Sequence, residues 1–130
     1  MRADDWKTRL DDWVNSVECR ALFDWETFNC GFLVADAAVA MGFDDPFAQY
    51  RGASVTELKD ISAHRLLDIV PFTQQPVAFA RAGDWLAYPG ICGGPWSLAV
   101  CLGKQALGFS ASGVLQRVDT LDAVKSYKVD

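Results

Sequence analysis

The chain has 130 residues, of which 51% are hydrophobic, and its formal net charge is −5. This length accommodates one domain, residues 1–130, with a core of its own, and the composition favours a globular fold over disorder. Because the charge is acidic and no run of Lys or Arg occurs, nucleic acid is not expected as a partner.

The N-terminal segment MRADDWKTRLDDW carries charges where a signal peptide needs an apolar stretch. No segment approaches the roughly 20 apolar residues that span a bilayer, so we expect no membrane span and a protein that folds in the cytoplasm. In that reducing compartment the four cysteines, Cys19, Cys30, Cys92 and Cys101, are expected to be thiols. The single histidine and the lack of a Cys-x-x-Cys pair argue against a metal site, and nothing in the sequence indicates a cofactor.

Two helices are predicted in the first third of the chain. The first covers Asp5–Ser16 and is amphipathic, with apolar residues at helical spacing and acidic residues on the other face. The second covers Cys30–Met41, where Asp36 is the only polar residue, and a helix that is apolar nearly all round belongs in the interior. Asn29 or Thr27 is expected to cap its start, and the glycine that follows is expected to end it.

The second half of the chain changes from helical to extended patterns. The sequence SVTE, from Ser54 to Glu57, has the form of a capping box and predicts a third helix that runs toward Ile69 and is closed by Pro71. Four short apolar runs bounded by Gly, Pro and Ser then predict an antiparallel meander over residues 84–88, 96–102, 105–109 and 113–118. A short helix near residues 121–125 and a strand over residues 126–129 complete the chain. Helices followed by strands predict an α+β domain whose N-terminal helices cover one face of a C-terminal antiparallel sheet.

Side chains alternate along the predicted strand WSLAVCL, residues 96–102. One face carries the large residues 96, 98, 100 and 102, and the other carries the small residues Ser97, Ala99 and Cys101. The small face is expected to accept a strip of small residues at positions 31, 35 and 38 of the second helix. In that arrangement Ser97 and Cys101 share one side of the sheet with Cys30.

Cys30 is expected at the N-terminus of a helix, where the helix dipole and unpaired backbone N–H groups stabilise a thiolate. This is the placement that a thiol hydrolase requires. Such an enzyme also needs a positioned base, usually His, and a third group that orients the base.

The order of several short motifs matches a known family. The motifs are FDWETFNCGFLVADAAVAMG, then RAGDWLAYP, then SLAVCLG followed by ALGFSASGV. With them the chain resembles the NlpC-type papain-like cell-wall peptidases over roughly residues 6–129, and more closely the small degenerate relatives encoded among bacteriophage tail genes. The resemblance implies a papain-like fold in which a helix opens with the nucleophilic Cys, a Gly-Asp pair leads into the first strand, and the catalytic His begins a later strand.

Residue by residue, the resemblance keeps one of the three catalytic positions. Cys30 matches the nucleophile, Gly83 and Asp84 match the Gly-Asp pair, and Ser97 falls where the His stands in the family. Ser110, after Phe109, lies near the third catalytic position. A serine has no titrating proton near neutral pH, so Ser97 cannot act as the general base.

The only histidine, His64, is expected on the solvated side of the third helix, between Asp60 and Asp68. The alternative is that His64 reaches Cys30 from a partner face or through an unexpected packing. Cys30 therefore keeps three interpretations: a buried inert thiol, a reactive thiol without hydrolytic activity, and a slow peptidase nucleophile. A disulfide between Cys30 and Cys101 under oxidation is a further hypothesis.

Two functions from different classes are compatible with this pattern. The resemblance implies a structural or assembly component of a phage tail tip or baseplate, with other tail proteins as partners, made in the host cytoplasm and carried in the virion tail. The alternative is an active cysteine peptidase or amidase that cleaves peptidoglycan stem peptides during phage entry. A third hypothesis is a binding module with a residual cleft near Cys30 and Trp85.

Overall fold

The structure, a computed structural model, describes residues 1–18, 22–90 and 94–130. This part of the chain forms three α-helices: α1 (Trp6–Glu18), α2 (Cys30–Ala40) and α3 (Val55–His64). Six strands follow: β1 (Thr73–Gln75), β2 (Trp85–Pro89), β3 (Trp96–Cys101), β4 (Gln105–Phe109), β5 (Leu115–Asp119) and β6 (Lys125–Lys128). Short 3-10 helices occur at η1 (Ala48–Tyr50), η2 (Val77–Phe79) and η3 (Thr120–Asp122). The predicted α+β class is confirmed.

All six strands form one antiparallel sheet with the order β1-β6-β2-β3-β4-β5. The predicted meander from β2 to β5 is confirmed. The last strand, β6, then returns across the sheet and pairs with β2, with Ser126 opposite Leu86. Beyond β6 lies β1, in a segment where no strand is expected from the sequence. The short helix predicted after β5 is the 3-10 turn η3.

The ends of the helices follow local hydrogen bonds. Asn29 caps α2, since its side chain accepts a hydrogen bond from the backbone N–H of Phe32, and Ser54 caps α3 by accepting from the backbone N–H of Glu57 at 3.2 Å. The prediction that α3 runs toward Ile69 is wrong, because the helix ends at His64. The chain turns there, and this turn brings the side chain of Leu66 into the core.

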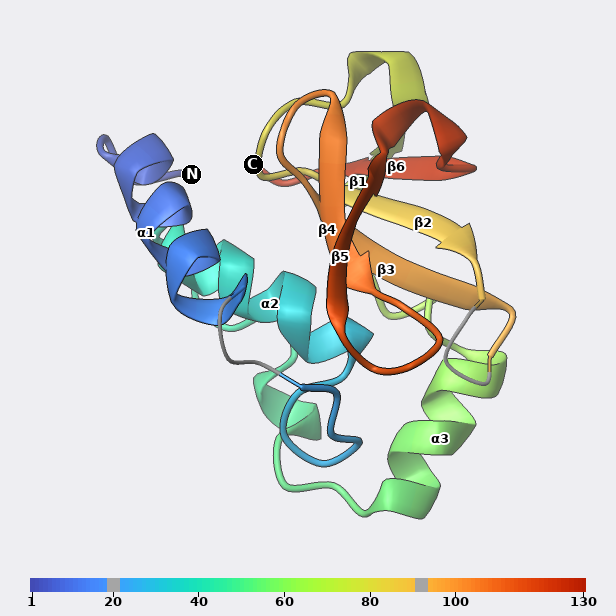
Figure 1. The fold of residues 1–130 in the computed structure, drawn as a ribbon. Coiled ribbons are helices and arrows are strands. Elements are labelled where there is room, and N and C mark those ends of the chain that lie inside the picture. The colour runs from blue at the N-terminus through green and yellow to red at the C-terminus, as the bar shows by residue number, and fades with distance from the viewer. Residues whose placement is uncertain (19–21, 91–93) are drawn as a thin grey trace.

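The core lies between the helices and one face of the sheet, and α2 is its centre. α2 packs on β3, β4 and α1, and eight of its 11 residues are buried. The sheet meets it with large side chains, chiefly Trp85, Leu98, Val100 and Leu107. Figure 1 shows α1 and α2 together beside the sheet and α3 apart from both of them.

The expectation that the small face of β3 meets α2 is wrong. Ala99 and Cys101 belong to a second apolar cluster on the other face of the sheet, together with Leu86 and Tyr88. The physical reason is complementarity of volume: the small residues of α2 leave room that the large side chains of β2, β3 and β4 fill to the density of a protein interior. Two strips of small residues facing each other would leave a void.

Candidate functional site

The candidate site is the N-terminus of α2, which the preceding loop and Asn29 hold in place. Asn29 is itself nearly buried; its Oδ1 accepts from Phe32 N at 2.9 Å and its Nδ2 donates to the carbonyl of Trp25 at 2.9 Å. These two bonds tie the loop to the first turn of the helix. Cys30 is the first residue of α2 and is 4% exposed.

Cys30 lines a narrow apolar cavity with an internal volume of about 30 Å³. That volume holds one or two water molecules and is too small for a peptide. One wall consists of aromatic side chains from the loop before α2 and from around η1: Phe23, Trp25, Phe47 and Tyr50. The opposite wall consists of side chains from α3 and the turn after it: Leu58, Ile61, Ser62, Leu66 and Ile69. Side chains of α3 are therefore part of the wall of the cavity that contains Cys30.

The only histidine of the chain does not reach this cavity. His64 is the last residue of α3, its side chain is 73% exposed, and its Nε2 lies 4.0 Å from Asp60 Oδ1. The predicted solvated position of His64 is confirmed. His64 is not among the residues that line the Cys30 cavity, so this subunit brings no imidazole to the thiol.

Ser97, which the resemblance aligns with a catalytic His, lies on the face of the sheet that is turned away from α2. It pairs with Tyr88 across β2 and β3, and it lines a shallow depression with Ala99 and Gly108. The structure therefore does not bring Ser97 and Cys30 together. The same sheet separates Cys30 from Cys101.

Ser110 lies in the turn between β4 and β5, outside the cavity. Its Oγ is 2.9 Å from Oγ of Ser112 and accepts a hydrogen bond from the backbone N–H of Val114 at 3.3 Å. The residue before it, Phe109, is buried and its ring makes an edge contact with Phe23 at a centroid distance of 5.2 Å. The two residues expected near the third catalytic position are thus a turn serine and a core aromatic residue.

Cys101 is a buried thiol whose Sγ donates to the carbonyl of Gly103 at 3.4 Å. Burial raises the pKa of Cys101, so this thiol is a poor nucleophile. Cys30 and Cys101 both keep their thiol form, and they belong to clusters on opposite faces of the sheet. The hypothesis of a disulfide between them is wrong. Cys19 and Cys92 lie outside the described residues.

The Gly-Asp pair stands at the start of β2. Gly83 has a φ of +91°, and a side chain there would collide with Sδ of Met41, so the position requires glycine. Asp84 is fully buried. Its carboxylate accepts four hydrogen bonds of 2.8–3.1 Å, from Arg2 Nη2, Val129 N, Gln75 Nε2 and Arg81 N.

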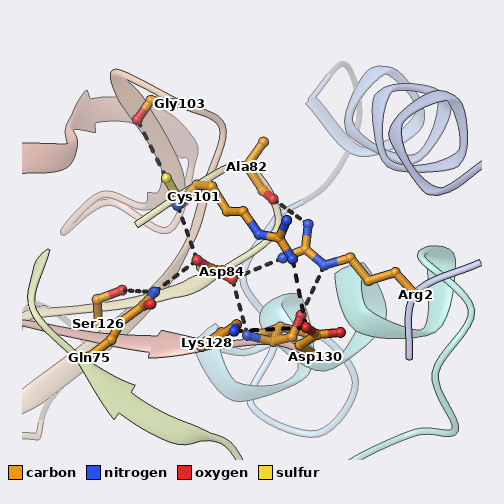
Figure 2. A network of polar contacts seen from close by, with 11 residues as sticks. Arg2, Gln75, Ala82, Asp84, Cys101, Gly103, Ser126, Lys128 and Asp130 are labelled. Atoms are coloured by element: carbon orange, nitrogen blue, oxygen red, sulfur yellow. Dashed lines mark hydrogen bonds and ion pairs between the residues drawn. The ribbon is translucent and has the colours of Figure 1, made fainter. Parts of the chain in front are cut away.

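Arg2 is the partner that makes this burial of Asp84 tolerable, and Figure 2 shows the two side chains facing each other. Besides the ion pair with Asp84 at 2.9 Å, its Nε donates to Val129 O at 2.9 Å and its Nη1 to Ala82 O at 2.8 Å. None of these residues lines the Cys30 cavity. The Gly-Asp pair therefore serves here to join segments distant in sequence, a role that sequence analysis missed because Arg2 lies 82 positions from Asp84.

Trp85 does not line the Cys30 cavity, so the expected cleft near both residues is not found in the described part of the chain. Trp85 is 0% exposed, and its ring packs against Phe47 and Phe72 at centroid distances of 5.4 and 5.0 Å. Within the described ranges no group of three or more His, Cys, Asp or Glu side chains is placed to bind a metal ion. No helix among these residues has the length and apolar character needed to cross a membrane.

The model of a family described as a domain of unknown function, DUF6950, matches residues 1–129. No curated protein matches the chain. Because the match covers nearly all residues, the chain belongs to the DUF6950 family.

Proposed function

We propose that this DUF6950 chain is a structural or assembly component of a bacteriophage tail tip or baseplate, built on an NlpC-like frame that has lost its catalytic machinery. The observation that carries the proposal is the state of Cys30. It lies 4% exposed in a cavity of about 30 Å³, and the single histidine of the chain stands elsewhere on the surface.

The chemistry of thiol hydrolysis explains why this observation favours a structural role. A cysteine peptidase needs a base that removes the thiol proton and later protonates the leaving amine, and this acid–base step contributes about 10²- to 10⁴-fold in rate. It also needs an open groove in which the scissile carbonyl approaches the sulfur. Here Cys30 is 4% exposed, and the cavity that it lines, of about 30 Å³, is too small for a peptide.

The assignment to a phage tail rests on the order of the motifs RAGDWLAYP, SLAVCLG and ALGFSASGV, which resembles the small tail-gene relatives of the peptidases. In this proposal the protein is made in the host cytoplasm, binds other tail-tip proteins during assembly and remains in the virion tail. In this role the domain is a rigid adaptor between tail-tip proteins, and the small cavity at Cys30 binds no substrate.

The test is to purify particles and assembly intermediates of the phage or prophage that encodes the chain, and to quantify the protein by mass spectrometry. We expect a fixed stoichiometry with tail-tip proteins. Absence from both preparations contradicts the proposal. A phage carrying Cys30→Ala is expected to assemble and infect as the parent does, because in this proposal the thiol only fills space in the cavity and takes part in no reaction.

One observation favours the alternative, a peptidoglycan peptidase or amidase. Cys30 keeps the first position of α2, where the helix dipole favours a thiolate. The base would have to come from a neighbouring subunit. Incubation of the chain and of purified tails with cell-wall muropeptides distinguishes the two functions, since peptide release that disappears in Cys30→Ala and persists in Cys101→Ala establishes the enzyme.

A further inference from the structure

A second and larger hollow lies beside the Cys30 cavity. It has a volume of about 400 Å³ and runs between the end of α3 with its following turn and the ends of strands β1, β3 and β6. We call it the Arg65 groove; the side chains that matter below are Arg65, Asp68, Gln74, Trp96, Lys125 and Tyr127. Its volume is within the range of ligand sites. Ser62 and Leu66 line both hollows and separate them.

The groove holds two cations without acidic partners. Among the described residues, no carboxylate lies within 4.0 Å of Arg65 or Lys125, whereas every other described arginine has an ion pair. The chain carries 17 acidic and 12 basic residues, so two unpaired cations in one groove are a local exception to its acidic charge. Asp68 also lines the groove and leaves it with an excess of one positive charge when His64 is neutral.

The same groove offers an aromatic surface and neutral hydrogen-bonding groups. Trp96 is half-buried, and Nζ of Lys125 lies 5.8 Å from the centroid of its ring. Tyr127 is mostly buried at the groove, and burial, together with the charge of Asp68, raises the pKa of Tyr127. Its hydroxyl therefore remains a donor at neutral pH, and the amide of Gln74 is both a donor and an acceptor.

We propose that the Arg65 groove binds an acidic, extended segment of a partner protein. Carboxylates of that segment pair with Arg65 and Lys125, and an apolar side chain packs on Trp96. Charge-assisted hydrogen bonds to the guanidinium give the affinity and the orientation. A polyphosphate strand is disfavoured, because it has no apolar side chain to place on Trp96. This inference goes beyond the proposed function and does not depend on it.

The test is an NMR titration of the ¹⁵N-labelled chain with the blocked hexapeptide Asp-Glu-Leu-Glu-Phe-Asp. We expect saturable shifts at the Trp96 indole N–H and at the Lys125 amide. The neutral isostere Asn-Gln-Leu-Gln-Phe-Asn is expected to bind at least about tenfold more weakly, since it lacks the charge-assisted bonds. The double variant Arg65→Gln/Lys125→Gln is expected to lose affinity for the acidic peptide by at least about tenfold.

The matched control is Lys104→Gln. Lys104 is exposed, has no carboxylate within 4.0 Å among the described residues, and lies in the turn between β3 and β4, outside the groove. This variant removes one positive charge and is expected to keep the parent affinity. Equal binding of the acidic and neutral peptides, parent affinity in the double variant, or the same saturation of the Trp96 signal by sodium sulfate at equal concentration would each overturn the proposal. Each outcome is independent of whether the protein is found in phage tails.

Discussion

The substitution Asp84→Asn tests whether the buried ion pair with Arg2 holds the fold together. The carboxylate of Asp84 accepts four hydrogen bonds at 0% exposure. An asparagine replaces one acceptor oxygen with an NH₂ group that faces existing donors, and it removes the carboxylate that forms the ion pair with the buried guanidinium of Arg2. Breaking a buried pair in this way costs about 3–5 kcal/mol. Since domains of this size are stable by about 5–15 kcal/mol, the variant is expected to be marginally folded.

The assay is urea unfolding of the parent and the variant, followed by tryptophan fluorescence at pH 7. Asp122→Asn is the control, because Asp122 is exposed and its neutralisation is expected to change the free energy of unfolding by less than about 0.5 kcal/mol. A change below about 1 kcal/mol for Asp84→Asn would refute the reasoning. That result would mean that water or rearranged side chains satisfy Arg2 when the carboxylate is removed.

Three further substitutions test other parts of the argument. Gly83→Ala places a side chain against a buried methionine at a φ of +91° and is expected to lower the free energy of unfolding by about 2–4 kcal/mol. The control, Gly52→Ala, has a φ of +83° and open space around it, and it should cost only about 1–2 kcal/mol. Similar costs for the two variants would contradict the predicted clash. Leu58→Ala removes part of the cavity wall that α3 provides around Cys30, and it should lower the free energy of unfolding by about 2–5 kcal/mol. It should also accelerate alkylation of Cys30 by iodoacetamide, measured by peptide mapping. An unchanged alkylation rate would show that α3 does not limit access to Cys30. Burial raises the pKa of Asp36, so the contribution of Asp36 to stability is present at low pH and is lost as pH rises through its folded-state pKa. In urea unfolding, Asp36→Asn should therefore gain stability relative to the parent as the pH rises from 4 to 7. A stability difference between variant and parent that does not change with pH would contradict this explanation.

The Gly-Asp pair joins segments that are distant in the sequence. The resemblance places this pair before the first strand of a peptidase, and here the same two residues stand before β2. Because Gly83 has no side chain, the backbone there lies close to Met41, the residue that follows α2. Asp84 binds Arg2 and Val129. The contacts of the pair in this chain therefore stabilise the fold.

The start of α2 and the meander were predictable because their signals are short-range. A side-chain cap at Asn29 needs only the backbone N–H of the residue three positions later. The glycine that follows α2 likewise ends the helix through its own backbone conformation. Alternation over five or six residues defines a strand without reference to its neighbours. The end of α3 at His64 was not predictable in this way, since the burial of Leu66 after a turn depends on the core that receives it.

One part of the candidate site follows from short-range sequence signals, and another part depends on the tertiary structure. The composition alone shows that the chain has a single histidine, and the sequence pattern alone places Cys30 at the start of a helix. Which face of β3 meets α2, and hence that Ser97 and Cys101 lie across the sheet from Cys30, was decided by the packing of volumes between distant segments. The pairing of Arg2 with Asp84 and the gathering of Arg65 and Lys125 in one groove have the same origin: contacts between residues far apart along the chain exist only once the core has brought them together.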